Sequence, residues 1–162
     1  MQVETVDYKA ADASTTLARS LRDTGFAVLA NHPITPDRIT EIYDGWGDFF
    51  AGKDKFDYAV QPPAHDGYFA FRSENAKDSP VKDLKEFFHV YPGCGLPAEL
   101  TEMTRRIYAD LNALGCELLA WIQAEAPASL TESLSMPLDT MMDDSEQSLL
   151  RILHYPPVSD AE

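Results

Sequence analysis

Residues 148–157 read SLLRILHYPP, and this stretch decides how the chain is interpreted. Its aliphatic side chains are typical of a strand that packs against a core. Pro156 and Pro157 must end that strand, because two consecutive prolines fix φ and donate no hydrogen bonds to a sheet. Just five residues follow, which leaves no later strand to pair with it. We therefore expect more polypeptide to come after this strand in the natural protein.

The composition indicates a globular chain with an acidic surface. Its 162 residues are 44% hydrophobic, which suits one domain or a piece of a larger one. Acidic residues outnumber basic ones by 27 to 13, and the net charge is −14. Such a surface repels phosphate backbones and anionic lipid, so we expect neither nucleic acid nor membrane as a partner. The simpler interpretation of this charge is solubility.

Cysteine usage and the amino terminus favour a cytoplasmic protein. Cys94 and Cys116 lack the spacing of a thiolate metal site and are interpreted as reduced thiols. Residues 1–10 contain no basic start followed by an apolar run, so no signal peptide is visible. No apolar stretch approaches the roughly 18 residues that would span a bilayer.

The spacing of apolar residues predicts an alternation of helices and short strands. Strands are expected at 3–8, 26–30, 82–91 and 149–155, and helices at 12–24, 36–51, 97–126 and 129–142, the last broken near Pro137. The strand at 26–30 is expected to be buried. The helix that starts after Thr35 carries a stripe too large to leave in water, which should pack across a sheet. That stripe consists of Ile39, Ile42, Tyr43, Trp46, Phe49 and Phe50.

Four segments, in the right order, resemble the isopenicillin-N-synthase-like branch of the Fe(II)/2-oxoglutarate oxygenases. SLLRILHYPP is similar to the family's LRLNYYPP, the strand that opens its catalytic jelly roll. TGFAVLANHPI at 24–34 is similar to its GFF-x-L-x-NHGI. GYFAFRSENAKDSPVKDLKEFFHV at 67–90 is similar to its GY-x-x-x-G-x-E…D-x-KE-x-F, and residues 3–8 resemble its short opening strand.

The resemblance implies an α+β fold, the helical and strand region that precedes a double-stranded β-helix, or jelly roll. Residues 1–147 would form this N-terminal region, and residues 148–162 would begin the catalytic jelly roll with its first core strand. The long helix at 97–126 would pack on the outside of the jelly roll. The sequence shows no repeat or linker that would mark another boundary.

The iron site that the resemblance implies is missing from this sequence. Such an oxygenase holds Fe(II) with two His and one carboxylate, and in the family the first two ligands form a His-x-Asp or His-x-Glu pair. Two places after the four histidines stand Ile34, Gly67, Tyr91 and Pro156, and none is an acid. The family's Arg-x-Ser, which clamps 2-oxoglutarate, is also missing. We therefore predict no metal ligand and no catalytic residue here, and expect both motifs in polypeptide that follows.

Three residues near the end of the chain are candidates for contact with 2-oxoglutarate. Tyr155 matches a family tyrosine that often hydrogen-bonds the distal carboxylate, although it could instead be an aromatic residue packed at a strand end. His154 replaces the family's commoner Tyr and could donate to the same carboxylate or be structural. Arg151 could face the cavity or pair with one of the many acids. Leu153 replaces the family's Asn, which changes the usual side-chain network.

Tyr68, Arg72 and Glu74 are candidates for contact with the primary substrate. They lie on the segment that in the family folds over the site, and the charged pair would suit a small charged molecule. Lys85 and Glu86 match the family's KE, for which we favour a structural ion pair. Glu86 and His89 have the spacing of a helical Glu-x-x-His metal pair, but the surrounding residues predict a strand.

We therefore interpret the chain as the N-terminal portion of an Fe(II)/2-oxoglutarate oxygenase that hydroxylates, desaturates or cyclises a small molecule. Its partners would be that molecule and the missing C-terminal jelly-roll region, and the chain alone should be inactive. The alternative is a non-catalytic binding module that retains the helical shell without the iron site. The sequence has no GxGxxG, Walker, GxSxG or HExxH motif that would favour another enzyme class.

Overall fold

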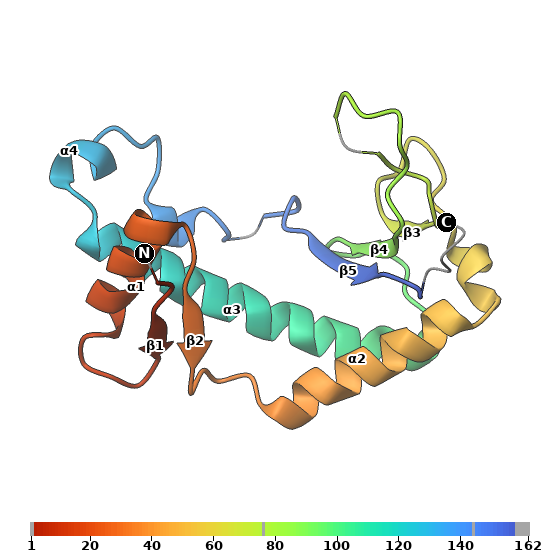
Figure 1. Cartoon of the computed structure of the whole chain (residues 1–162), viewed down its shortest axis with the longest axis horizontal. Helices are drawn as coiled ribbons and strands as arrows, with labels where there is room; N and C mark the ends of the chain where they lie inside the picture. Colours follow the sequence, from red (N-terminus) through yellow and green to blue (C-terminus); the bar gives the residue numbers. More distant parts are fainter. Residues whose placement is uncertain (1, 76, 144, 158–162) are drawn as a thin grey trace. The chain divides into compact units, whose positions relative to one another are not determined.

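The computed structural model describes residues 2–75, 77–143 and 145–157, and these divide into two compact units (Figure 1). One unit comprises residues 1–38 and 106–145, and the other comprises residues 39–105 and 146–162. The strands are β1 (Thr5–Asp7), β2 (Val28–Ala30), β3 (Gly67–Phe69), β4 (Glu86–Val90) and β5 (Leu150–His154). The α-helices are α1 (Ala13–Thr24), α2 (Pro36–Ala51), α3 (Thr101–Glu125) and α4 (Ala128–Thr131), and short 3-10 helices lie at Asp54–Tyr58 (η1), Ala98–Leu100 (η2) and Leu138–Thr140 (η3).

The first unit is built on two parallel strands joined by a helix. β1 pairs with β2 so that Val6 lies opposite Leu29, and α1 connects them. Gly25 ends α1 in the left-handed conformation (φ 79°) that glycine adopts without strain, as its place after the apolar repeat predicts. The core of this unit consists of Val6, Ala13, Leu17, Leu21, Ala27, Leu29, Leu118, Trp121 and Ile122.

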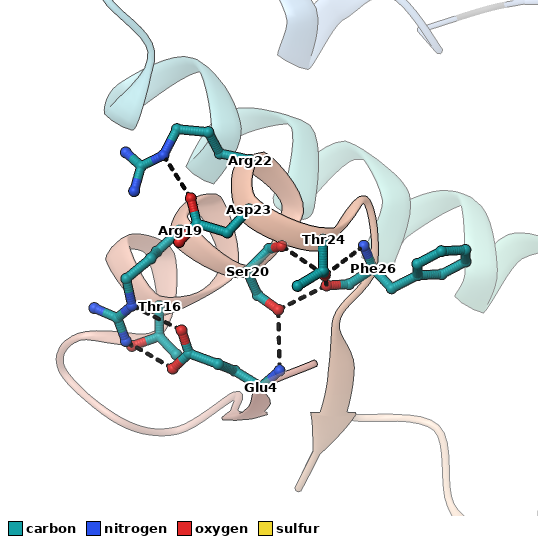
Figure 2. Close-up of polar contacts among 8 residues, drawn as sticks. All are labelled: Glu4, Thr16, Arg19, Ser20, Arg22, Asp23, Thr24 and Phe26. Carbon is teal, nitrogen blue, oxygen red and sulfur yellow. Dashed lines mark hydrogen bonds and ion pairs between the residues drawn. The ribbon is translucent and has the colours of Figure 1, made fainter. Parts of the chain in front are cut away.

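A buried hydroxyl ties the end of α1 to both strands. Ser20 Oγ accepts from the Glu4 backbone N–H at 3.1 Å and donates to the Phe26 carbonyl at 2.6 Å (Figure 2). Thr24 Oγ1 donates to the Ser20 carbonyl, and Arg19 makes a two-pronged ion pair with Glu4. The contacts of Ser20 and Thr24 satisfy backbone groups where α1 meets the strands, and the Arg19–Glu4 pair adds an exposed link.

The second half of α3 completes the first unit. The ring of Tyr8 lies 5.2 Å from that of Trp121, and its hydroxyl donates to Glu117, which raises the pKa of Tyr8 to about 12. Two hydroxyls near the start of α1, those of Ser14 and Thr15, donate to the Glu125 carboxylate at 2.9 Å.

Two predictions for the first unit are wrong. Phe26 and Val28 are exposed, so the strand at 26–30 is not buried. Among the described strands, the short β2 pairs with β1. The helix expected at 129–142 is shorter than predicted, since α4 ends at Thr131, but the predicted break near Pro137 is confirmed, because Pro137 is extended and η3 begins after it.

The second unit is an antiparallel sheet with the order β3-β4-β5, packed against α2. Phe88 of β4 lies opposite Tyr68 of β3 and Ile152 of β5, so the three side chains share one face. On α2, Trp46 and Phe49 meet that face, with their rings 5.0 and 5.8 Å from the ring of Phe88. The predicted packing of α2 across a sheet is confirmed for the buried part of its stripe.

The other part of the stripe is not covered. Ile39 and Tyr43 are exposed, and a cleft of about 350 Å³ lies between this side of α2 and β5. Trp46 Nε1 donates to Thr104 Oγ1 at 3.0 Å in the buried interior, which joins α2 to α3.

β5 belongs to the same unit as β3 and β4, and the boundary predicted between residues 147 and 148 stays a prediction. The remaining residues of the predicted jelly-roll start, 158–162, lie outside the described residues. Within the part of the chain that the structure describes, β5 pairs with β4 along one edge and with no strand along the other. Leu149 and Leu153 are exposed there.

None of the described helices is both long and apolar enough to cross a membrane.

We predict that the 162-residue chain self-associates through this free edge, because unpaired backbone groups beside apolar side chains recruit further strands. A charge at the edge, as in Leu153→Lys, should shift the chain toward monomer, as measured by light scattering after size-exclusion chromatography. Val81→Lys is the matched control, because Val81 is exposed in a loop and should not affect association. A monodisperse, cooperatively melting wild-type monomer would contradict the prediction.

Candidate functional site

The register of the three-stranded sheet divides its side chains between two faces. Glu86 lies opposite His154, and His89 lies opposite Arg151. Residues three apart on a strand project to opposite faces, so Glu86 and His89 are separated by the sheet. The predicted strand is confirmed, and these two side chains do not form a Glu-x-x-His metal pair.

The helix-facing side holds a buried carboxylate with three donors. Glu86 is 3% exposed and accepts from Lys55 Nζ at 2.9 Å. It also accepts from the hydroxyl of Tyr68 and from His154 Nδ1, the latter at 2.7 Å. Lys55 Nζ donates in addition to the Phe50 carbonyl at the end of α2. The cluster therefore joins η1, α2 and all three strands.

The electrostatics of this cluster keep Glu86 ionised. Burial raises the pKa of the carboxyl, but the hydrogen bonds from Tyr68, Lys55 and His154 together outweigh it, and the net pKa lies below the ordinary value of 4.5. Burial, followed by the hydrogen bond to the Glu86 carboxylate, raises the pKa of Tyr68, which remains a neutral donor.

Tyr68 and His154 were both predicted to contact a ligand, and both belong to this supporting cluster. Tyr68 is 1% exposed, and its ring packs edge-on against Phe49. The ring of His154 stacks on Phe50 at 5.1 Å. The Tyr68 hydroxyl and His154 Nδ1 are directed to Glu86, and His154 also lines the cleft beside α2; the contact of these two residues with a ligand stays a prediction.

The opposite side of the sheet, which we call the outer face, consists of Phe69, Phe87, His89, Arg151 and Leu153. Phe69 and Phe87 stack with their rings 4.5 Å apart. The guanidinium of Arg151 lies 4.8 Å above the ring of Phe87, and its Nε donates to His89 Nε2 at 2.8 Å. Aromatic rings, a cation and a buried imidazole thus share one surface.

The loop between β3 and β4 brings further charges to the outer face. Glu74 lies 4.0 Å from Arg151 Nη1 and 3.5 Å from Lys85 Nζ. Lys85 also pairs with Asp83 at 2.9 Å, and its ammonium lies 5.7 Å from the centre of the Phe87 ring. Two cations and a carboxylate therefore surround one aromatic side chain.

Arg72 and Tyr155 are the other two predicted contacts. The guanidinium of Arg72 lies 5.3 Å from the ring of Phe71, and the Arg72 backbone has a positive φ of 62°. Tyr155 is exposed directly after β5. Of the six predicted contacts, the structure brings Arg151 and Glu74 together and separates them from His154 and Tyr68.

Sequence reasoning missed two participants. Lys55 lies in the least regular part of the sequence, and nothing in its neighbourhood indicated a buried partner. His89 was identified as a histidine without an acid two places on, but its contact with Arg151 depends on the strand register. Lys85 and Glu86 are both in structural ion pairs, as favoured, although not with each other.

The described residues do not provide an iron site. Across residues 2–75, 77–143 and 145–157, no group of three His, Cys, Asp or Glu side chains lies close enough to hold a metal ion. The residues present therefore do not fit the metal that the sequence resemblance implies.

Comparison with known proteins identifies the family. Residues 3–107 match the family model described as the N-terminal region of non-haem dioxygenases in morphine synthesis. The chain belongs to this family, and the predicted resemblance to Fe(II)/2-oxoglutarate oxygenases is confirmed. No curated protein matches the chain significantly.

Solved structures agree with this assignment. A candidate oxygenase from Shewanella oneidensis is 40% identical, with a TM-score of 0.88 over 100% of this chain and 57% of its own. A candidate 2OG-Fe(II) oxygenase family protein from Caulobacter crescentus is 28% identical, with a TM-score of 0.71 over 96% of this chain and 57% of its own. A full-length Neurospora crassa protein, solved in complex with alpha-KG and thymine, is 21% identical and shares the fold (TM-score 0.69, 95% of this chain and 55% of that one). The chain thus spans a little more than half of these proteins.

We predict that Lys55→Met destabilises the protein by about 3–5 kcal/mol, because it leaves the Glu86 carboxylate buried without its counter-ion. The free energy of unfolding, from denaturant titration of the intact gene product, measures this. Lys85→Met is the matched control: both lysine side chains are 14% exposed, but the partners of Lys85 are about one-third exposed. The control should cost only about 0–1 kcal/mol. Equal losses would show that the buried cluster has no special role.

The same cluster gives a pH dependence. The pKa of Glu86 is lower in the folded than in the unfolded state, so its contribution to stability is present above the ordinary value of 4.5 and is lost as the pH falls through the folded-state pKa. We expect the stability of Glu86→Gln to fall less steeply than that of wild type below pH 4.5. Parallel curves would contradict this.

Proposed function

We propose that the chain is the N-terminal portion of an Fe(II)/2-oxoglutarate-dependent oxygenase that hydroxylates, desaturates or cyclises a small molecule. The observation that carries this is the outer face of the sheet, where Arg151, Glu74 and Lys85 surround the ring of Phe87 in a chain of this family. The surface offers charges of both signs, which suits a small polar organic molecule; the ring of Phe87 is itself buried beside Arg151 and Lys85.

In this proposal Arg151 and Tyr155 meet the carboxylate of 2-oxoglutarate. An arginine binds a planar carboxylate through two parallel N–H donors, and a tyrosine hydroxyl can add a third. Arg72 and Glu74 would meet the charged groups of the primary substrate, with Tyr68 supporting the sheet beneath them. His154 would support the sheet through its bond to Glu86.

The metal would be held by polypeptide that this chain does not include, the C-terminal jelly-roll region. Iron and 2-oxoglutarate would supply the oxidising chemistry when bound there. The part of the protein described here would contribute a rigid sheet, fixed charges and a surface that excludes water. We also propose a cytoplasmic location, which accords with two free cysteines, one of them buried.

The alternative is a non-catalytic binding module. It is favoured by one observation, that no metal-binding group of side chains is present among the described residues. Such a module would bind a charged small molecule on the same face without converting it to a product.

We predict that anaerobic addition of Fe(II) and 2-oxoglutarate to the 162-residue chain gives no visible charge-transfer band, because its described residues bring no set of metal ligands together. Absorption spectroscopy measures this, with an established 2-oxoglutarate oxygenase as the positive control. A band would mean that histidines and carboxylates of this chain converge into an iron site after all.

For the intact gene product, we expect Fe(II)-dependent conversion of 2-oxoglutarate to succinate and CO₂. Succinate formation with and without a chelator measures it. A gene that ends at Glu162 and a product that forms no succinate would exclude the enzyme and leave the binding module.

A further inference from the structure

His89 occupies an unusual position on the outer face, because both of its ring nitrogens are engaged. Nδ1 lies 3.0 Å from the His65 carbonyl, which can only accept a hydrogen bond. Nε2 lies 2.8 Å from Arg151 Nε, which can only donate. The proton of the imidazole must therefore be on Nδ1, and Nε2 must be an unprotonated acceptor. These two contacts are compatible only with a neutral ring.

This arrangement holds Arg151 at two points. The contact with His89 fixes the Nε edge of the guanidinium, and the face of Phe87 supports its plane at 4.8 Å. Among the residues that the structure describes, Glu74 is the acid paired with Arg151, and its carboxylate is 4.0 Å from Nη1, beyond hydrogen-bond distance. The side chain of Arg151 is 37% exposed. The guanidinium of Arg151 is therefore preoriented, and its Nη donors lie at the surface without a hydrogen bond to Glu74.

We propose that Arg151 binds a carboxylate of a ligand on the outer face and that His89 is the positioning residue that orients it. Arginine is suited to this role because its planar donors match the two oxygens of a carboxylate. A neutral imidazole is a suitable second residue, because it accepts from Arg151 without neutralising its charge, as a carboxylate in the same place would. The inference rests on the proposed function for the source of the carboxylate, either 2-oxoglutarate or the primary substrate.

The surroundings of His89 favour the neutral ring. Burial is the largest effect and lowers the pKa of His89 below the ordinary value of 6.5, and the positive charge of Arg151 acts in the same direction. His65, from the segment before β3, also lowers it, whereas Glu74 and the hydrogen bond to the His65 carbonyl raise it. The rings of Phe69, Phe87 and Tyr91 complete the contacts and carry no charge.

The test uses glutarate, a dicarboxylate without the keto group, on the metal-free intact gene product. Binding is followed by NMR through the Arg151 Nε–H signal and by calorimetry. We expect saturable binding that Arg151→Gln weakens at least about tenfold. The imidazole nitrogen shifts should show a neutral His89 with its proton on Nδ1 at about pH 7.

Two variants of His89 separate positioning from packing. His89→Phe keeps an aromatic ring against Phe69 and Phe87 but removes the acceptor, and should weaken glutarate binding about tenfold and alter the Arg151 Nε–H signal. His89→Gln can accept from Arg151 and donate to the His65 carbonyl, and should restore affinity to within about twofold of wild type. His65→Ala is the control, because His65 contributes its backbone carbonyl, and it should bind like wild type.

Three results would overturn the proposal. If Arg151→Gln binds glutarate as tightly as wild type, or if wild type does not bind it, the outer face is not a carboxylate site. If His89→Phe binds like wild type while Arg151→Gln does not, His89 has no positioning role.

The affinity of Arg151→Gln for 2-oxoglutarate, compared with that of wild type, identifies the source of the carboxylate. A matching loss of 2-oxoglutarate affinity in Arg151→Gln assigns the site to the co-substrate, and unchanged affinity assigns it to the primary substrate. The intact gene product could bind glutarate in a way that depends on Arg151 and His89 and yet form no succinate. That result would support the inference and contradict the proposed enzymatic function.

Discussion

The buried carboxylate of Glu86 is the constraint on which the second unit depends. Three donors from three separate segments, Lys55, Tyr68 and His154, converge on one side chain that is 3% exposed. A buried charge is tolerated only while such partners are in place. The position of η1, the pairing of the three strands and the end of α2 are therefore linked through one group of hydrogen bonds.

This arrangement also separates support from recognition. Because directly opposite residues of an antiparallel pair share a face, Glu86 and His154 lie toward α2, whereas His89 and Arg151 lie on the outer face. Each face has one histidine with a defined partner, and the two partners differ in kind. On the side toward α2, the Glu86 carboxylate holds the His154 imidazole. On the outer face, the His89 imidazole holds the Arg151 guanidinium, which remains accessible.

Much of the fold follows from local pattern, whereas the site depends on register. The apolar repeats of α1, α2 and α3 and the proline stop after β5 are local signals, and the structure confirms them. The exposure of Phe26 was missed because periodicity cannot show whether a short apolar strand is covered. His154 and Arg151 were assigned to one ligand because both lie in the segment that resembles the family's LRLNYYPP. Their separation, and the contact of Arg151 with a histidine 62 residues away, appears only when β4 and β5 are aligned.

The three donors of Glu86 also differ in how far they lie along the chain. Tyr68 is 18 residues away, Lys55 is 31 and His154 is 68. During synthesis from the amino terminus, the first two are made before Glu86 and the third only after the whole of α3. We expect the nascent sheet to begin as the β3–β4 hairpin with two donors and β5 to join it by closing a long loop, a step that is slow because its entropy cost is met before its contacts form. Of these three strands, the last to leave the ribosome is the one that completes the hydrogen bonding of a charge buried near the middle of the chain.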